Sequence, residues 1–261
     1  MSDKSSIRAS FLIRFGYIGS PFHGLQPSPG LATAGGALRD ALSEAAGMPP
    51  KALQFSARTD AGVHALENYA SCWFPKPFDT NRFQQGIRAR SHELLFAEAI
   101  VVPYFVHARA NAQGKWYRYV IEDGSSDNES KDFVWNIVPQ LDAAAMHRAA
   151  NYLVGTHEFD AFRHGGCTQN STTKTLTEVS VTRLGRQIHI DIRGTAFLRR
   201  MVRIIVGTLA EVGAGFRNPD DMRTIIASKH RWQAGPSAPA CGLMLMRVDF
   251  DNVAGLATTR K

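Results

Sequence analysis

Residues 178–193 read EVSVTRLGRQIHIDIR, and this stretch carries the clearest fold signal in the chain. Isoleucine stands at every second position from 188 to 192, and the residues between are polar. Because successive side chains of a strand point to opposite faces, this alternation predicts a half-buried strand. The dipeptide Gly185-Arg186 separates that strand from a second run, residues 178–184, so the whole stretch predicts an antiparallel hairpin.

Similar signals occur on both sides of this hairpin. Aromatic and β-branched runs predict further strands at Phe11–Tyr17, Asn68–Phe74, Lys115–Ile121 and Leu243–Phe250. Apolar residues at helical spacing, or capping residues, predict helices at Ala37–Ala46, Ala143–Leu153 and Phe197–Val212, and a last helix that opens at Pro219. The helix at Phe197–Val212 is apolar almost all round, which indicates a buried helix.

These elements predict an α+β fold of two similar halves, each an antiparallel sheet with flanking helices. The polar run Asp123–Asp132 is the best candidate for the seam between the halves, although it could equally be the loop of a long surface hairpin. The expected division is therefore an N-terminal half at residues 1–122 and a C-terminal half at residues 133–261, acting together as one catalytic unit.

Length and composition exclude several classes of protein. With 261 residues, 44% hydrophobic and 20% charged, the chain can bury a core without disulfides or a structural metal, and it is neither disordered, collagen-like nor a coiled coil. Nothing approaches the ~18 apolar residues of a membrane span, and the charged first residues do not resemble a signal peptide. Cys72, Cys167 and Cys241 suit neither a disulfide framework nor a zinc site. A reduced, cytoplasmic protein is expected.

The charge balance is basic, with 30 Lys and Arg against 23 Asp and Glu, a formal net charge of +7. Such an excess favours a polyanionic partner, because Lys and Arg neutralise nucleic-acid phosphates. A basic but merely solvated surface is the alternative, and charge alone gives the two similar weight.

No Walker loop, dinucleotide-binding GxGxxG, GxSxG or HExxH motif is present. The segment richest in side chains that could take part in catalysis is residues 56–65, SARTDAGVHA. It contains an arginine, a hydroxyl, a carboxylate and a histidine close to Gly62 in sequence. Loops on a rigid scaffold often carry catalytic groups. From composition alone an ordinary turn, in which Asp60 satisfies nearby backbone N–H groups, is the better interpretation.

That decapeptide resembles the RTDAGVH signature of the TruA family of tRNA pseudouridine synthases. The resemblance continues in order along nearly the whole chain, through the opening segment at 16–26, FVHAR at 105–109, KWYRY at 115–119, GTHEF at 155–159, FLRRMVRIIVG at 197–207 and APACGL at 238–243. RTDAGVH and MVRIIVG are specific motifs, whereas the others would be weak alone. The resemblance implies a pseudouridine synthase-like fold with the active-site cleft between the two halves.

The resemblance implies three catalytic residues. Asp60 is the carboxylate that acts on the nucleotide, whether it attacks the base, attacks the ribose or takes a proton. A carboxylate in a dry pocket needs a cation beside it, and Arg203, in an apolar helix where a buried charge must be paired, is the implied partner. On pattern alone, Arg203 could equally reach solvent or pair with another acid. Tyr117 matches the active-site tyrosine of the family, and Tyr119 is expected in the core.

The resemblance also implies an RNA-binding set made of Gln26, Arg58, His64, Arg163, Arg199 and Arg200, and the basic residues Arg82, Arg88 and Arg90 are candidates to hold the body of the RNA. The expected activity is isomerisation of uridine in tRNA, at positions 38, 39 and 40 of the anticodon stem-loop. No cofactor and no metal are expected, and the expected partners are tRNA and a second copy in a homodimer. The alternatives are the same chemistry on another RNA site and a non-catalytic RNA-binding relative.

Overall fold

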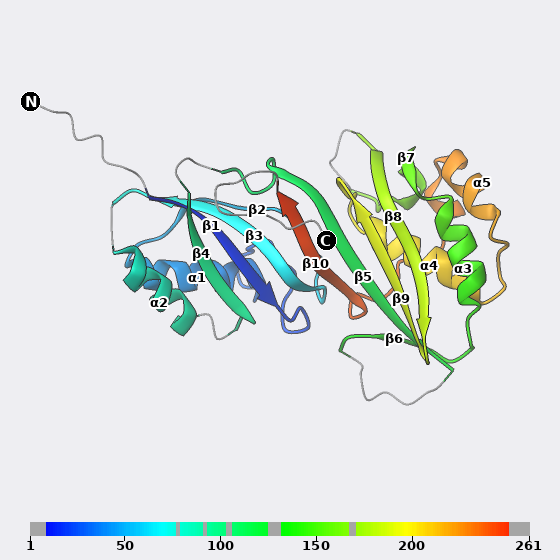
Figure 1. The fold of residues 1–261 in the computed structure, drawn as a ribbon, viewed down its shortest axis with the longest axis horizontal. Coiled ribbons are helices and arrows are strands. Elements are labelled where there is room, and N and C mark those ends of the chain that lie inside the picture. The colour runs from blue at the N-terminus through cyan, green and yellow to red at the C-terminus, as the bar shows by residue number, and fades with distance from the viewer. Residues whose placement is uncertain are drawn as a thin grey trace, which may run out of the picture. The chain divides into compact units, whose positions relative to one another are not determined.

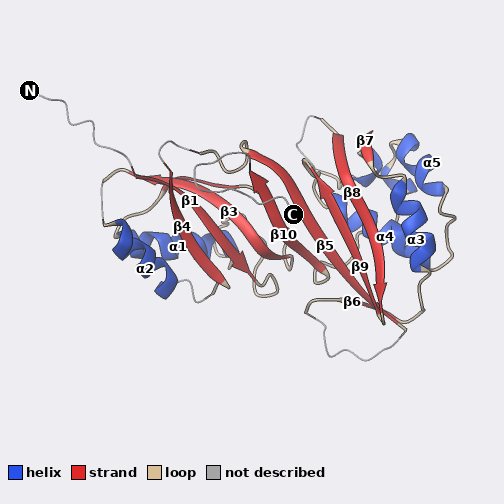
Figure 2. Cartoon of the chain, in the orientation of Figure 1, coloured by secondary structure: helices blue, strands red, loops and turns tan. Residues whose placement is uncertain are grey.

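The structure is a computed structural model, and it describes residues 9–76, 79–90, 93–102, 106–124, 132–166 and 171–250. Its contacts divide the chain into two compact units, residues 1–113 with 247–261 and residues 114–246. Both units combine antiparallel strands with helices (Figures 1 and 2), which confirms the α+β fold class. The expected halves, residues 1–122 and 133–261, have other boundaries than these two units. That the two halves act as one catalytic unit stays a prediction.

The first unit is built on three adjacent strands with a short fourth. The order is β4 (Phe96–Val102), β1 (Ala9–Tyr17) and β3 (His64–Phe74), all antiparallel, and β2 (Lys51–Phe55) pairs with β3. The two helices of this unit, α1 (Ala34–Ala46) and α2 (Thr80–Arg90), contact each other.

An aromatic cluster joins the helices of the first unit to its sheet. Phe83 of α2 packs on Phe11 and Phe74, with ring centres 5.0 and 5.3 Å apart. All three side chains are buried, and aromatic rings of this size bury enough apolar area to dominate a small core. Thr33 accepts a hydrogen bond from the Gly36 N–H and so begins α1, three residues before the predicted start.

The second unit contains the predicted hairpin. Its strands follow the order β5 (Ala112–Asp123), β9 (Gln187–Gly194), β8 (Thr173–Leu184) and β7 (Gly155–Glu158), all antiparallel, and β6 (Trp135–Ile137) lies parallel to β5. Leu184 pairs directly with Gln187, so Gly185-Arg186 forms the turn. The isoleucines at 188, 190 and 192 are fully buried, as the alternation predicted.

Among its described residues, the second unit has three helices and two 3₁₀ turns. They are α3 (Ala143–Asn151), η1 (Asp160–Phe162), α4 (Met201–Gly213), α5 (Asp221–Ser228) and η2 (Arg231–Gln233). Asp142 caps α3 as predicted, accepting from the Ala145 N–H. Helix α4 begins at Met201 and not at Phe197, because Arg200 has φ +59° and interrupts the helical backbone. The last predicted strand is β10 (Leu243–Phe250), and it crosses the boundary between the units.

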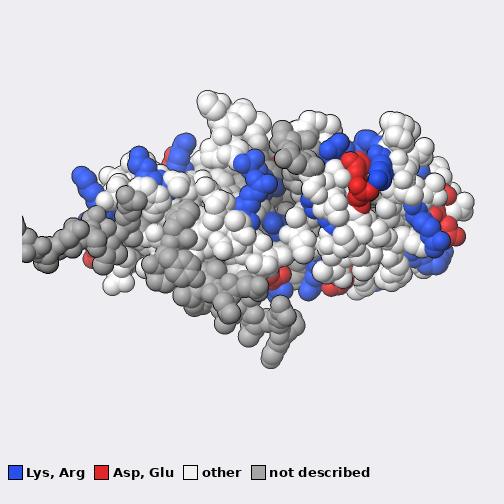
Figure 3. All heavy atoms as spheres, turned by 90° about the horizontal axis from the view of Figure 1, so that it is seen from above, with Lys and Arg blue, Asp and Glu red and all other residues white. Residues whose placement is uncertain are grey.

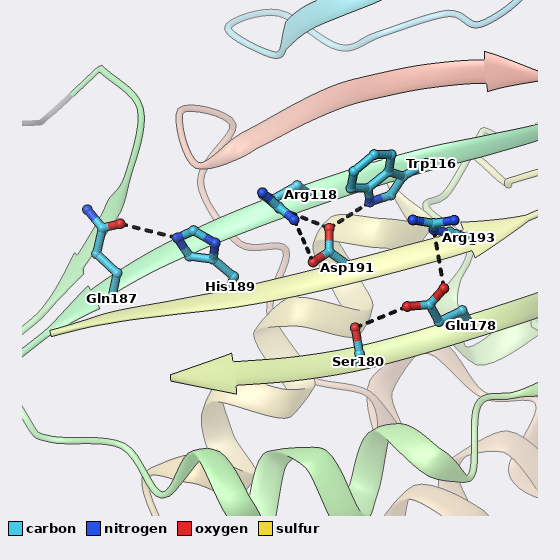
Figure 4. Close-up of polar contacts among 8 residues, drawn as sticks. All are labelled: Trp116, Arg118, Glu178, Ser180, Gln187, His189, Asp191 and Arg193. Atoms are coloured by element: carbon cyan, nitrogen blue, oxygen red, sulfur yellow. Dashed lines mark hydrogen bonds and ion pairs between the residues drawn. The ribbon is translucent and has the colours of Figure 1, made fainter. Parts of the chain in front are cut away.

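The polar face of the hairpin and of β5 carries a network of paired charges (Figure 4). Asp191 accepts hydrogen bonds from the indole N–H of Trp116 at 2.6 Å and from Nε and Nη2 of Arg118 at 2.9 and 3.0 Å. The guanidinium of Arg193 lies 4.5 Å from the Trp116 ring centre and pairs with Glu178. These arginines are therefore engaged inside the protein, as a half-buried sheet face requires.

A second paired charge ties the end of β5 to β8 and to the start of α3. The Asp123 carboxylate is 2% exposed and accepts from both terminal nitrogens of Arg183, at 2.9 and 2.7 Å, and from the Leu141 N–H at 2.8 Å. The hydrogen bonds from Arg183 lower the pKa of Asp123 below its ordinary value. The ion pair therefore contributes stability above the ordinary carboxyl pKa, and that contribution is lost as the pH falls through the lowered value.

We expect Asp123→Asn to lower the free energy of unfolding by about 2–3 kcal/mol at pH 7, since a charge-assisted bidentate pair is lost. Urea unfolding at pH 7 and pH 3 measures the effect, and the variant should lose less stability on acidification than the wild type. Asp40→Asn is the control, because Asp40 forms an exposed pair with Arg39 and such pairs contribute about 0–1 kcal/mol. Equal acid sensitivity in wild type and Asp123→Asn would contradict the linkage.

Candidate active site

The segment SARTDAGVHA connects β2 to β3 in the first unit, and its ends are buried. Ser56, Ala57, Val63 and His64 are each less than 5% exposed, whereas Arg58 is exposed and Asp60 is half-buried. The loop is therefore held at both ends and presents its middle residues outward, which is the arrangement a catalytic loop requires.

A buried asparagine supports the base of this loop. Asn68 of β3 is fully buried, accepts from the Ser56 hydroxyl at 2.7 Å and donates to the Ala57 carbonyl at 3.0 Å. Buried polar groups of this kind must be satisfied, and here their satisfaction fixes the path of the chain into the loop. Asn68 is not among the expected site residues, since β3 also contains Glu67 and Ser71 and the sequence does not single out the amide.

The loop after β1 lies against the segment from Thr59 to His64. The Tyr17 hydroxyl hydrogen-bonds the Thr59 hydroxyl at 2.8 Å, and burial raises the pKa of Tyr17 to about 12. The Leu25 N–H donates to the Thr59 carbonyl at 3.2 Å. The Gly19 N–H donates to Nδ1 of His64 at 3.1 Å. His64 is thus buried as a link between the two loops, and its contact with RNA stays a prediction.

Two glycines in the loop after β1 make this close approach possible. A Cβ on Gly19 would lie 2.2 Å from the Val63 carbonyl oxygen, and one on Gly24, which has φ +92°, would lie 3.0 Å from the Thr59 carbonyl oxygen. No side chain fits at the distance found for Gly19, and the positive φ of Gly24 strains any other residue there, so glycine is required where the two backbones meet.

Asp60 is the first residue of a tight turn. The Val63 N–H donates to the Asp60 carbonyl at 3.2 Å, and Gly62, the third residue of the turn, has φ +77°. A positive φ at that position is the geometry that favours glycine. The turn therefore explains the Asp-Ala-Gly-Val order and fixes the backbone that carries the carboxylate.

In the second unit, Tyr117 and Tyr119 point to the buried face of β5. Tyr117 is 7% exposed and its ring meets that of Phe197 edge-on, with centres 5.0 Å apart. Tyr119 is fully buried, and its hydroxyl donates to the Pro239 carbonyl at 2.8 Å. Burial raises the pKa of Tyr119. Tyr119 is a core residue as expected, and Tyr117 lies nearer the surface.

Arg203 lies in the first turn of α4, between the buried Val202 and Ile204. Its Nε donates to the Ala238 carbonyl at 2.7 Å, and its own backbone carbonyl accepts from the Ala238 N–H at 2.9 Å. The segment before β10 is thereby fixed on the helix, and a Cβ on Gly207 would lie 1.9 Å from the Pro236 carbonyl oxygen. The Arg203 side chain is thus anchored at Nε.

The remaining expected RNA-binding residues fall in both units. Gln26 and Arg58 are exposed in the first unit. In the second, Arg163 follows η1 and lies 3.8 Å from Asp160, Arg199 is exposed, and Arg200 is half-buried. The structure brings Arg163 and Arg199 near each other, because the His164 N–H donates to the Arg199 carbonyl at 3.2 Å. Asp60 belongs to the first unit and Tyr117 and Arg203 to the second, so their joint action stays a prediction.

Basic side chains are distributed over the surface in several groups. Figure 3 shows Lys and Arg at separate places, and at its right-hand end, which carries the second unit, Asp or Glu side chains lie among them. Within the described ranges, no group of three or more His, Cys, Asp or Glu side chains is placed to hold a metal ion. In the same ranges, no helix has the length and apolarity needed to cross a membrane.

Comparison with known proteins gives a consistent result. A family model described as tRNA pseudouridine synthase matches residues 149–251. The chain is 38% identical over 236 residues to a protein of Syntrophotalea carbinolica, covering 90% of this chain and 93% of the relative. It is also 38% identical to proteins of Rhodopseudomonas palustris, with 90% and 95% covered, and of Shouchella clausii, with 91% and 92% covered. All three are named tRNA pseudouridine synthase A.

We expect Gly19→Ala to displace the loop around Asp60 and to destabilise the protein by about 1–3 kcal/mol, because the added methyl group overlaps a backbone carbonyl. Urea unfolding and hydrogen exchange of the amides at 59–63 measure the two effects. Gly165→Ala is the control, since no atom lies within 4 Å of the position of its Cβ. Superimposable unfolding curves for wild type and Gly19→Ala would refute the close-approach argument.

Proposed function

This chain belongs to the tRNA pseudouridine synthase A family, and from that premise we propose that it converts uridine to pseudouridine in tRNA, at positions 38, 39 and 40 of the anticodon stem-loop. The observation that carries the proposal is the 38% identity to a relative of that name over 90% of the chain. The fixed turn at Asp60 supports it, because the positive φ of Gly62 and the close approach of Gly19 to Val63 hold the motif loop in place.

The reaction is an isomerisation in which atoms and electrons balance within the nucleotide. The bond from N1 of uracil to C1′ of the ribose breaks, a bond from C5 to C1′ forms, C5 loses a proton and N1 gains one. No oxidant or reductant is consumed. The protein must supply access to a base that is normally stacked and a carboxylate that is ionised beside it. Asp60 is the proposed carboxylate.

Two further residues complete the proposed chemistry. Tyr117 is the proposed aromatic face for the target base, and the edge-on contact with Phe197 holds its ring in place on β5. Arg203 supplies the cation for the Asp60 carboxylate. The support is chemical, because a guanidinium offers its N–H donors as a rigid planar fork that suits a carboxylate, and the hydrogen bond of Nε to the Ala238 carbonyl orients that fork.

We further propose that Gln26, Arg58, His64, Arg163, Arg199 and Arg200 form the RNA-binding set, in which the exposed Arg58 and Arg199 contact phosphates and the buried His64 acts through the loop that it holds. We also propose that the protein acts as a homodimer in the cytoplasm. The exposed Arg82 and Arg88 of α2, together with Arg90, would hold the tRNA body while the other subunit modifies it. Phosphate contacts position a nucleic acid and are independent of its sequence. Light scattering of the free protein and of its tRNA complex tests the dimer.

Asp60→Asn is expected to abolish isomerisation while tRNA affinity and folding stay close to the wild-type values, because the substitution removes charge and keeps shape. Release of tritium from tRNA labelled at C5 of uridine measures turnover, and filter binding measures affinity. Asp40→Asn serves as the matched control on an exposed helical carboxylate. Turnover by Asp60→Asn at anything near the wild-type rate would end the assignment of Asp60.

Arg203→Met is expected to lose activity at neutral pH, because the substitution removes the cation proposed for the Asp60 carboxylate. Methionine preserves the helix, being a good helix former of similar length. Arg203→Lys should retain more activity than Arg203→Met, because it keeps the charge and loses only the planar fork. Tritium release measures turnover, and a wild-type rate for Arg203→Met would contradict the pairing.

A further inference from the structure

The segment after α5 exposes a pair of stacked aromatic rings. The side chain of Trp232 is 73% exposed. The rings of His230 and Trp232 are 4.2 Å apart between centres, with planes inclined by 12°. One face of the indole is therefore covered by His230 while most of its surface stays in solvent. Exposed aromatic faces are the surfaces on which unpaired bases stack in proteins that bind single-stranded nucleic acid.

Hydrogen bonds hold this pair in a fixed local conformation. Lys229 ends α5 with φ +59°, a left-handed conformation that is uncommon outside glycine. The His230 N–H then donates to the Ser228 hydroxyl at 3.2 Å, and the Gln233 N–H donates to the His230 carbonyl at 3.1 Å. Nη1 of Arg231 closes the segment on the Ala234 carbonyl at 3.1 Å. A platform ordered before binding loses less entropy when a ligand arrives.

Basic residues lie on the segments next to the platform, and two of them, Lys229 and Arg163, pair with Glu158 and Asp160. The η1 turn contacts η2, α5 and α4, so it brings together the segments that carry Trp232, Lys229 and Arg199. Arg163 follows η1 directly, and Lys229 pairs with the exposed Glu158 just before η1. Arg199 is exposed on the loop that leads into α4. This edge of the second unit thus offers a planar apolar surface within a positively charged setting.

We propose that Trp232, stacked on His230, is a platform for one unpaired nucleobase of the tRNA that this chain binds. A nucleobase presents a flat face of the right size, and the phosphates on either side of it match the charges of Lys229, Arg231 and Arg199. Base–aromatic stacking is tolerant of sequence and suits unpaired nucleotides. The inference rests on the proposed function for the identity of the RNA, but it assigns a contact outside the catalytic residues.

The decisive measurement is the tRNA affinity of Trp232→Ala and Trp232→Phe, each made in the Asp60→Asn background so that the bound RNA is not altered. Stacking of one base is worth about 1–3 kcal/mol, so Trp232→Ala should weaken binding about fivefold or more. Trp232→Phe should retain most of the affinity, because phenylalanine still offers a ring face. Phe216→Ala, which removes an aromatic side chain that is 81% exposed, should change affinity less than about twofold.

Salt dependence separates stacking from charge. Trp232→Ala should leave the slope of log affinity against log salt unchanged, whereas Lys229→Ala should reduce that slope by about 0.7–0.9 for one phosphate contact. Affinity of Trp232→Ala within twofold of the parent would overturn the platform. Weaker binding that accompanies a change of oligomeric state, measured by light scattering, would also overturn it, since Trp232 would then lie between two copies of the chain.

The same variants distinguish a failure of this inference from a failure of the proposed function. If the wild-type protein isomerises uridine and Trp232→Ala binds tRNA normally, the platform fails and the enzyme assignment stands. If tRNA is bound but not isomerised, and Trp232→Ala weakens that binding, the enzyme assignment fails and the platform stands.

Discussion

The close approach of two loop backbones is the constraint on which the surroundings of Asp60 depend. Gly19 comes so near to Val63 that a side chain has no room there, and Gly24 approaches Thr59 with a positive φ that strains other residues. Once the backbones are in contact, hydrogen bonds from Tyr17 and Gly19 hold the motif loop from one side. Loops rarely have enough contacts of their own to be rigid, and here the rigidity comes from a second loop about forty residues earlier in the chain.

A similar close approach of two backbones occurs in the second unit. Helix α4 lies so close to the segment before β10 that only glycine fits at position 207. The reciprocal hydrogen bonds of Arg203 and Ala238 form one turn away on the same helix. The two residues proposed to carry opposite charges in catalysis, Asp60 and Arg203, are thus each fixed by backbone contact within their own unit. A side chain held in this way needs little reorganisation when a substrate binds.

The basic charge of the chain divides into two kinds of residue. Arg118 and Arg183 are occupied by buried or half-buried carboxylates, and they stabilise the sheet of the second unit. Arg58 and Arg199 are exposed, and they are available to phosphate. The net charge of +7 is in accord with a polyanionic partner. Because some arginines pair with carboxylates of the protein, fewer of them can contact RNA than the number of arginines suggests.

Local pattern determined most of the secondary structure, because a two-residue alternation, a two-residue turn and a capping aspartate act over a few positions. The hairpin at 178–193 and the cap at Asp142 were predicted on that basis, and the motif containing Asp60 was recognised as a contiguous stretch. The start of α4 was predicted wrongly, since apolar residues fill a turn as readily as a helix when Arg200 adopts φ +59°. Only the tertiary structure decided that His64 is buried and that Asn68 supports the loop, because those contacts join distant segments and leave no periodic trace in the sequence.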